Sequence, residues 1–429
     1  MNDIYTQLIG RENSDNPVSV AIVGAGQMGT EIITQIGEMK GMQVTVVVDL
    51  NEELARKGFL YMKNKSDLFF TNNIDEAEDA VKKGKTIVTE NYKVATRLSM
   101  VEAVVDATGS IELGVVIGLD CIDHKKHIIM MNVECDITIG PLLRKMAENA
   151  GVVYSMAAGD EPAAIMELYR FAKALGFEVI AAGKGKNNPL NLYATPDTEH
   201  EMAKARKMSP RMLCEFVDGS KTAIEMASVS NATGLIVDVP GMHGATAKVP
   251  ELNKVFIPKK DGGILHNRGI VDFSIGVHPG VFLIIHTDNP RIQEGLVQRD
   301  MGNGPYYTLY RPFHLCSIEV PLTIAQAVFY KESHGHPKSY LTSECIAVAK
   351  KDIKEGETLD GIGEYCYRVS IDRYDSALDK GYIPAGLVHG TKARTNISKN
   401  TVVTYEMVDS VHDTVLLQFR KIQDRLYVK

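Results

Sequence analysis

Three glycines in the stretch VAIVGAGQMG constrain most strongly what this chain can fold into. Gly24, Gly26 and Gly29 follow the spacing G-x-G-x-x-G. An apolar, β-rich run at 18–23 precedes them, and residues 28–36 carry apolar side chains at helical spacing. A strand, a glycine turn and a helix in this order predict a cradle in which the pyrophosphate of a dinucleotide meets the first turn of the helix.

Further cofactor contacts are expected where later strands end. Asp49 follows the predicted strand 44–48 and lies twenty residues after Gly29. An acid at this place binds a ribose hydroxyl and favours NAD over NADP, although Arg56 in the next helix could soften that preference. Thr108 and Gly109 follow a later strand, at the sheet edge where ligands bind. The predicted cofactor-binding residues are Gly24, Gly26, Gln27, Met28, Gly29, Asp49, Thr108 and Gly109.

The alternation of strands and helices over residues 1–157 predicts a Rossmann-type, doubly wound parallel sheet of the α/β class. Residues 158–335 mix helices and strands and are expected to form an α+β substrate domain, with a late helix that could pack back on the first domain. Residues 340–429 carry short apolar runs (CIAVA, TVVTYEMV, TVLLQF) between turn residues and predict a small β-rich domain. The segment 333–340 is expected to be a linker.

Composition narrows the class of partner. The net charge is −7 and no basic tract is present, which argues against nucleic acid as a partner and for a small-molecule substrate. The first residues do not resemble a secretory signal, and no apolar run approaches the roughly 18 residues of a membrane span. Six cysteines without a C-x-x-C pair suit reduced thiols. We therefore expect a cytoplasmic protein without membrane contact.

Two polar pairs are candidates for acid–base chemistry. Lys184 and Lys186 follow a predicted strand in AAGKGKNNPLN, beside Asn187. A buried lysine can polarise a carbonyl group or protonate an alkoxide, and Lys184 is the preferred candidate, with Lys186 and Asn187 as substrate contacts. Asp160 and Glu161 precede a helix, where Asp160 could serve only as a cap. Their alternative role is in acid–base catalysis or as ligands of a divalent ion.

A helix expected over 220–233 carries a polar stripe. Lys221, Glu225, Ser228 and Asn231 recur at helical spacing between apolar residues, which suggests that the stripe lines a wet cleft. A surface ion pair between Lys221 and Glu225 is the plainer alternative. We expect Lys221 and Glu225 to take part in catalysis and Asn231 to bind substrate.

Histidines in two glycine-containing loops complete the predicted site. His243 lies in DVPGMHG and His278 in GVHPG. Either imidazole could bind a phosphate or a carboxylate, or serve as an acid. Both are assigned to substrate binding.

Longer stretches resemble a known group of enzymes. AIVGAGQMG, HIIMMNVECDITIG, AAGDEPAAIMELY, GKGKNNPLN, DVPGMHG and GNGPYYTLYRPFHLCSIEVP resemble homoserine-dehydrogenase-like oxidoreductases with a C-terminal SAF domain, and more narrowly the type II 1-deoxy-D-xylulose-5-phosphate reductoisomerases. The tail CIAVAKKDIKEGETLDGIG resembles the start of a SAF β-clip domain. The resemblance implies NADP or NAD as cofactor, Mg²⁺ or Mn²⁺ as a candidate ion, a role in isoprenoid biosynthesis and a homodimer.

One departure separates the chain from true homoserine dehydrogenases. Those enzymes have an Asn-Lys pair after the strand that corresponds to HIIMM, whereas here Asn132 is followed by Val133 and Glu134. The expected activity is isomerisation plus hydride transfer on a small phosphorylated or polyol-type carbonyl compound. Homoserine dehydrogenase or another sugar-acid or polyol dehydrogenase is the alternative. A cofactor-binding sensor protein is the second alternative.

Overall fold

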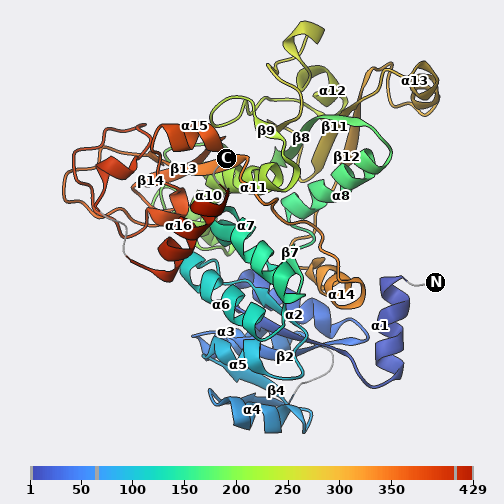
Figure 1. Cartoon of the computed structure of the whole chain (residues 1–429), viewed down its shortest axis with the longest axis vertical. Coiled ribbons are helices and arrows are strands. Elements are labelled where there is room, and N and C mark those ends of the chain that lie inside the picture. Colours follow the sequence, from blue (N-terminus) through green and yellow to red (C-terminus); the bar gives the residue numbers. More distant parts are fainter. Residues whose placement is uncertain (1–2, 63–66, 410–412, 428–429) are drawn as a thin grey trace. The chain divides into compact units, whose positions relative to one another are not determined.

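The computed structural model describes residues 3–62, 67–409 and 413–427, which pack as two compact units. The first unit comprises Met1–Ala163 and Leu315–Ser339, and the second comprises Ala164–His314 and Tyr340–Lys429. Each unit therefore combines two separate stretches of the chain (Figure 1). The division into domains at 1–157, 158–335 and 340–429 stays a prediction.

A seven-stranded sheet forms the centre of the first unit, and every neighbouring pair of strands in it is parallel. The strand order is β3-β4-β2-β1-β5-β6-β7. Strands β2 to β4 thus lie on one side of β1 and β5 to β7 on the other, so the carboxyl end of β1 lies at the switch point of a doubly wound sheet. The strands are β1 (Val18–Val23), β2 (Met42–Val48), β3 (Leu68–Phe70), β4 (Thr86–Thr89), β5 (Ala103–Asp106), β6 (His127–Met130) and β7 (Tyr154–Met156).

Helices connect these strands, as expected for parallel crossovers. The connecting helices are α2 (Gln27–Gly37), α3 (Glu52–Leu60), α4 (Ile74–Val81), α5 (Tyr92–Arg97), α6 (Ile111–Asp123) and α7 (Val133–Ala150). The unit also contains α1 (Ile4–Asn13), which precedes β1, and α14 (Val320–Tyr330) from the later stretch. The side chains of Val320, Ile324 and Val328 in α14 belong to the same buried core as β1 and α2. A helix from far along the chain therefore completes the core of the first unit.

His127, the first residue of β6, should make the stability of this unit depend on pH. Its Nδ1 accepts the Val153 N–H at 2.9 Å, and burial together with the nearby charge of Lys331 lowers the pKa of His127 to about 4. The unfolded chain takes up the proton near pH 6.5 but the folded chain does not, so folding loses free energy as the pH falls through this window. At pH 5 the expected loss is about 2 kcal/mol.

Thermal denaturation at pH 7 and pH 5 checks this expectation. The midpoint of the wild type should fall more steeply between these pH values than that of His127→Gln, which cannot take up the proton. Equal slopes in the two proteins would show that His127 is not the titrating group.

The second unit contains a mixed five-stranded sheet of order β12-β11-β8-β10-β9 and an antiparallel ribbon of β13 and β14. Helix α11 packs against β10 and against both strands of the ribbon. The strands are β8 (Glu178–Lys186), β9 (Ile236–Val237), β10 (Ile270–Ile275), β11 (Val281–His286), β12 (Tyr306–Arg311), β13 (Ser343–Ala349) and β14 (Tyr367–Arg373). The helices are α8 (Glu161–Ala174), whose first residues belong to the first unit, α9 (His200–Arg206), α10 (Pro210–Val217), α11 (Ser220–Thr233), α12 (Leu252–Val255), α13 (Pro290–Val297), α15 (Tyr374–Asp379) and α16 (Val415–Tyr427).

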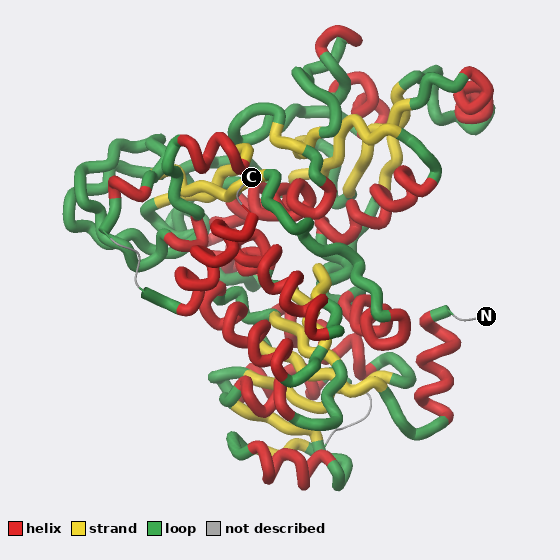
Figure 2. Tube along the Cα trace, viewed as in Figure 1, coloured by secondary structure: helices red, strands yellow, loops and turns green. Residues whose placement is uncertain are grey.

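The tail departs from the sequence prediction in one respect. Most of it consists of loops and short strands (Figure 2), but TVLLQF, expected as part of the β-rich domain, opens helix α16. Leu416, Leu417, Arg420 and Gln423 are its buried residues, at helical spacing, and the Arg420 guanidinium bonds the buried Glu344 carboxylate of β13. The run TVLLQF is too short to show the helical spacing of these buried residues, which continues beyond it.

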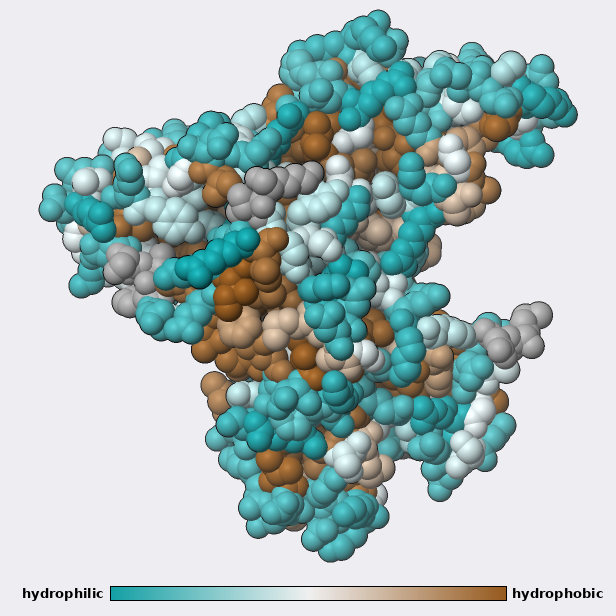
Figure 3. Space-filling model, in the orientation of Figure 1, coloured by the Kyte–Doolittle hydropathy of each residue, from teal (hydrophilic) through white to brown (hydrophobic). Residues whose placement is uncertain are grey.

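The surface is mostly hydrophilic on the face that Figure 3 shows, because the apolar side chains of both sheets are largely buried. Within the described residues, no helix has the length and apolar character needed to cross a membrane.

Candidate functional site

The three glycines of the loop after β1 lie in two kinds of surroundings. Gly24 has φ +96°, and a Cβ there would lie 2.6 Å from the Ala107 carbonyl oxygen of the neighbouring loop. A Cβ on Gly29 would lie 1.9 Å from the Gly24 carbonyl oxygen. Gly26 is exposed, and a Cβ there would meet nothing within 4 Å. Two glycines thus serve close packing, while the middle one leaves open space at the loop surface.

The beginning of α2 differs from the other helices of the sheet crossovers. Asn or Ser side chains cap α3 to α7, but the N-cap residue of α2 is Gly26, which has none to offer. Among the described residues, no acceptor bonds the amide groups of Gln27 and Met28. These N–H groups and the positive end of the helix dipole can bind a negatively charged phosphate, so the loop fits the pyrophosphate of a dinucleotide.

Asp49 follows β2 beside this loop. Its carboxylate accepts the Ala25 N–H at 2.7 Å and the Asn51 N–H at 2.8 Å, so it is fixed at the carboxyl edge of the sheet. Arg56 instead bonds Glu52, with Nη2 2.7 Å from Oε1, and its guanidinium lies 4.1 Å from the centre of the Phe70 ring.

The loop after β5 carries Thr108 and the exposed Gly109, which has φ +63°. The Thr108 hydroxyl and amide both donate to the buried Asp106 carboxylate, at 2.7 Å and 3.0 Å, and the Asn132 amide donates to the same carboxylate at 3.1 Å. Burial raises the pKa of Asp106. The hydrogen bonds of Thr108 therefore fix the conformation of this loop. Asn132 bonds the same carboxylate and also caps α7.

In the second unit, the sheet and α11 bring two predicted catalytic residues together. Lys184 on β8 and Glu225 on α11 form an ion pair, and their side chains are 6% and 1% exposed. Lys186 is also buried, and its Nζ bonds the Phe216 carbonyl oxygen. Burial and the charge of Lys184 lower the pKa of Lys186 to about 8. Two buried lysines thus lie at the end of β8, and one of them is paired with a carboxylate of α11.

The other predicted residues of this unit lie in varied surroundings. Asn231 is buried, and its side-chain oxygen accepts the amides of Thr342 and Ser343 at 2.8 Å and 3.0 Å, a structural role at the start of β13. Thr222 to Thr233 are all buried, so the polar stripe of α11 is enclosed. Lys221 is half-buried at the start of this helix, and Asn187 and His278 are exposed.

Asp160 and Glu161 lie in the first unit, at the turn into α8, and both are buried. The Cys316 thiol is 3.8 Å from Asp160 Oδ1 and 3.2 Å from the Gly159 carbonyl oxygen.

His243, one of the predicted substrate contacts, is held by two acidic side chains. Its Nε2 lies 2.8 Å from Asp238 Oδ2, and its backbone N–H donates to the buried Asp272 carboxylate at 3.1 Å. Neither acid was among the candidates from the sequence, nor were Asp106 and His266. A charged residue inside the apolar run IVDFSI was the one available signal for Asp272.

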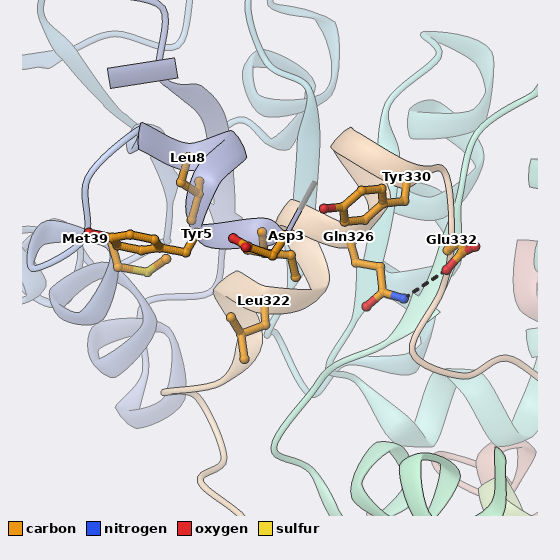
Figure 4. A pocket seen from close by; sticks show the side chains of 9 residues that line it. Asp3, Tyr5, Leu8, Met39, Leu322, Gln326, Tyr330 and Glu332 are labelled. Atoms are coloured by element: carbon orange, nitrogen blue, oxygen red, sulfur yellow. Dashed lines mark hydrogen bonds between the residues drawn. The ribbon is translucent and has the colours of Figure 1, made fainter. Parts of the chain in front are cut away.

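A shallow groove of about 750 Å³ lies in the first unit between α1 and α14 (Figure 4). Tyr5, Leu8, Leu322 and Tyr330 are among the side chains that line it, and it contains none of the candidate residues.

Comparison with known proteins identifies the class of enzyme. Residues 159–320 match the family model described as Oxidoreductase DRL, catalytic domain. This stretch includes Lys184, Lys186 and Glu225. Together with the Rossmann-type unit and its glycine loop, the match shows that the chain is an NAD(P)-dependent oxidoreductase. No curated protein matches the chain.

Solved structures resemble the chain only distantly. An oxidoreductase from Magnetospirillum magnetotacticum is 14% identical, with 63% of this chain and 75% of that chain covered at a TM-score of 0.36. An oxidoreductase from Bacillus subtilis is 12% identical, with 73% and 90% covered at 0.36. Scyllo-inositol dehydrogenase from Lactobacillus casei is 13% identical, with 63% and 73% covered at 0.32. Scores this low carry no information on substrate or site.

Proposed function

We propose that the protein reduces a small phosphorylated or polyol-type carbonyl compound, in the manner of 1-deoxy-D-xylulose-5-phosphate reductoisomerases. The observation that carries the proposal is the buried ion pair of Lys184 and Glu225, inside the stretch that matches an oxidoreductase catalytic domain. Enclosed ion pairs occur in structural positions too, but a lysine paired with a carboxylate at the end of a strand of the catalytic stretch is a candidate for proton transfer, because burial and a charge partner tune proton affinity.

The residues divide the work between the two units. In the first unit, the amides of Gln27 and Met28 and the open surface of Gly26 hold the pyrophosphate, and Asp49 binds the ribose. Bound NAD(P)H supplies the hydride. Because Asp49 is an acid and Arg56 is engaged with Glu52, we expect NADH to bind more tightly than NADPH.

In the second unit, the Lys184 ammonium donates a hydrogen bond to the substrate carbonyl oxygen and then gives a proton to the alkoxide. Glu225 keeps that ammonium oriented and charged in its buried position. Lys186 adds a second positive charge, which stabilises an enediolate during isomerisation. The SAF-type assignment of the tail, the homodimer and the cytoplasmic location stay predictions.

A substrate panel tests this function. Oxidation of NADH and NADPH is followed with 1-deoxy-D-xylulose 5-phosphate, aspartate semialdehyde and a set of ketoses, each with and without Mg²⁺ or Mn²⁺. Turnover of the first compound supports the proposal. Turnover of ketoses alone would make the protein a polyol dehydrogenase, and turnover of aspartate semialdehyde alone would make it a homoserine dehydrogenase. Cofactor binding without any turnover would favour a sensor protein.

A further inference from the structure

Two histidines of the second unit direct a ring nitrogen at the same carboxylate oxygen. Asp238 follows β9 directly, His243 lies in the loop that comes next, and His266 lies shortly before β10. His243 Nε2 is 2.8 Å from Asp238 Oδ2, and His266 Nδ1 is 3.3 Å from it. The three ligand atoms all lie within 4.8 Å of one another. The two rings are stacked, with their centres 5.9 Å apart.

Hydrogen bonds fix the carboxylate on which these rings converge. The Asp238 side chain is fully enclosed, and its Oδ1 accepts the backbone and side-chain N–H groups of Asn267 at 3.0 Å and 2.8 Å. The backbone N–H of His266 donates to Oδ2 at 2.8 Å. These bonds, with that of His243, hold the carboxylate in one orientation.

A second buried acid fixes the loop that carries His243. The Asp272 carboxylate accepts the backbone N–H groups of His243 and Gly244 at 3.1 Å and 2.9 Å. Met242, the residue before His243, has φ +69°, a left-handed conformation that a side chain disfavours. Strain of this kind is kept where the surrounding structure requires one loop geometry.

We propose that Asp238, His243 and His266 form a binding site for a divalent transition-metal ion. Ligand atoms about 2.0–2.1 Å from one ion lie about 2.9–3.4 Å apart at adjacent positions, close to the two distances seen here. Two imidazoles with one carboxylate suit Zn²⁺, Co²⁺ or Ni²⁺, whereas Mg²⁺ prefers an all-oxygen set. Of the two ions that the sequence resemblance suggests, Mg²⁺ and Mn²⁺, the site therefore disfavours Mg²⁺.

The site is partly open to solvent. The side chain of His266 is 49% exposed and that of His243 is 15% exposed. Three protein ligands leave a coordination position for water or for an oxygen atom of a bound small molecule. The proposal uses neither Lys184 nor the glycine loop, so it does not depend on the proposed function.

Lys259 provides a test specific to this geometry. Its Nζ lies 2.7 Å from His266 Nε2, on the far side of the ring from Asp238. The Lys259 ammonium competes with ion binding in two ways. It repels a cation, and it donates a hydrogen bond to Nε2 of His266. A His266 ring that binds the ion through Nδ1 must instead carry its own proton on Nε2. Lys259→Ala should therefore tighten metal binding, whereas loss of either histidine should weaken it.

The experiment uses the full-length protein after treatment with a chelator and dialysis, without cofactor or substrate. Co²⁺ is titrated by its visible absorption and Zn²⁺ by calorimetry. One equivalent should bind, and His243→Ala and His266→Ala should each weaken binding by more than about tenfold. His200→Ala, which removes an exposed histidine of the same unit, is the matched control and should bind the ion as the wild type does.

Three outcomes would overturn the proposal: no binding by the wild type, binding that is unchanged in both histidine variants, or displacement of Co²⁺ by equimolar Mg²⁺. Circular dichroism of each variant shows whether it has folded. The exposed His266 and Lys259 keep the test usable even if His243→Ala fails to fold. Since turnover is not measured, failure here leaves the proposed function to be tested by its own assay.

Discussion

Replacing Gly29 with alanine should cost the protein both stability and cofactor binding, whereas replacing Gly26 should cost cofactor binding alone. A Cβ at Gly29 would lie 1.9 Å from the Gly24 carbonyl oxygen, so α2 must move away from β1. Overpacking of this kind lowers the free energy of unfolding by about 1–3 kcal/mol. The amide groups at the start of the displaced helix then lie in the wrong place to bind the pyrophosphate, so cofactor affinity falls.

The Gly26→Ala variant separates these two effects. Gly26 is exposed, its φ of −64° is open to alanine, and a Cβ there meets nothing within 4 Å. Its stability should change by less than about 1 kcal/mol. The methyl group occupies the space through which the pyrophosphate approaches the backbone, so affinity for NADH should fall by more than about tenfold.

Thermal denaturation and calorimetric titration with NADH and NADPH measure both quantities. If Gly26→Ala binds both dinucleotides as tightly as the wild type, the glycine loop is not their binding site. If Gly29→Ala keeps its full stability, the close approach of α2 to β1 is not required by the fold.

Removing the buried Lys184–Glu225 pair should reduce turnover by about 10²–10⁴ while NADH affinity stays the same. Lys184→Met alone would leave Glu225 enclosed without this partner, and breaking a buried pair costs about 3–5 kcal/mol. The double variant Lys184→Met with Glu225→Gln removes both charges and limits this loss. NADH affinity should persist because the glycine loop belongs to the other unit.

A matched control is available in the same unit. Arg420 of α16 and Glu344 of β13 form an ion pair whose side chains are both 3% exposed, and neither residue is assigned to the site. Arg420→Met with Glu344→Gln should lower stability comparably but leave kcat nearly unchanged. Equal loss of kcat in the two double variants would mean that the Lys184 pair serves only the fold.

The sequence predicted the elements that local pattern determines. The run 18–23 with its glycine turn became β1 and α2, and IMELYRFAKALGF became most of α8. The same kind of reasoning missed α16, since TVLLQF shows its helical period only when the polar residues after it are included. Local sequence pattern is enough to predict a strongly patterned strand or helix, but it does not predict the secondary structure of a short apolar run at the boundary of an element.

The candidate site was only partly predictable, because tertiary packing assembles it. Lys184 and Glu225 are 41 residues apart and were chosen separately; their pairing follows from the packing of β8 and α11 within one unit. Asp238 and His266 are 28 residues apart and meet because β9 and β10 are neighbours in the sheet. Asn231 was chosen for a polar stripe, and nothing in the sequence indicated that its side-chain oxygen accepts two backbone amides at β13.

The return of α14 to the first unit has a consequence for synthesis of the chain. Val320, Ile324 and Val328 lie in the same core as β1, α2 and, from α1, Leu8. During translation, the first unit cannot complete this core until α14 has left the ribosome, after the whole of the 164–314 stretch has emerged. The nascent chain therefore exposes part of this apolar core while that stretch is synthesised, a condition in which chaperones protect nascent chains.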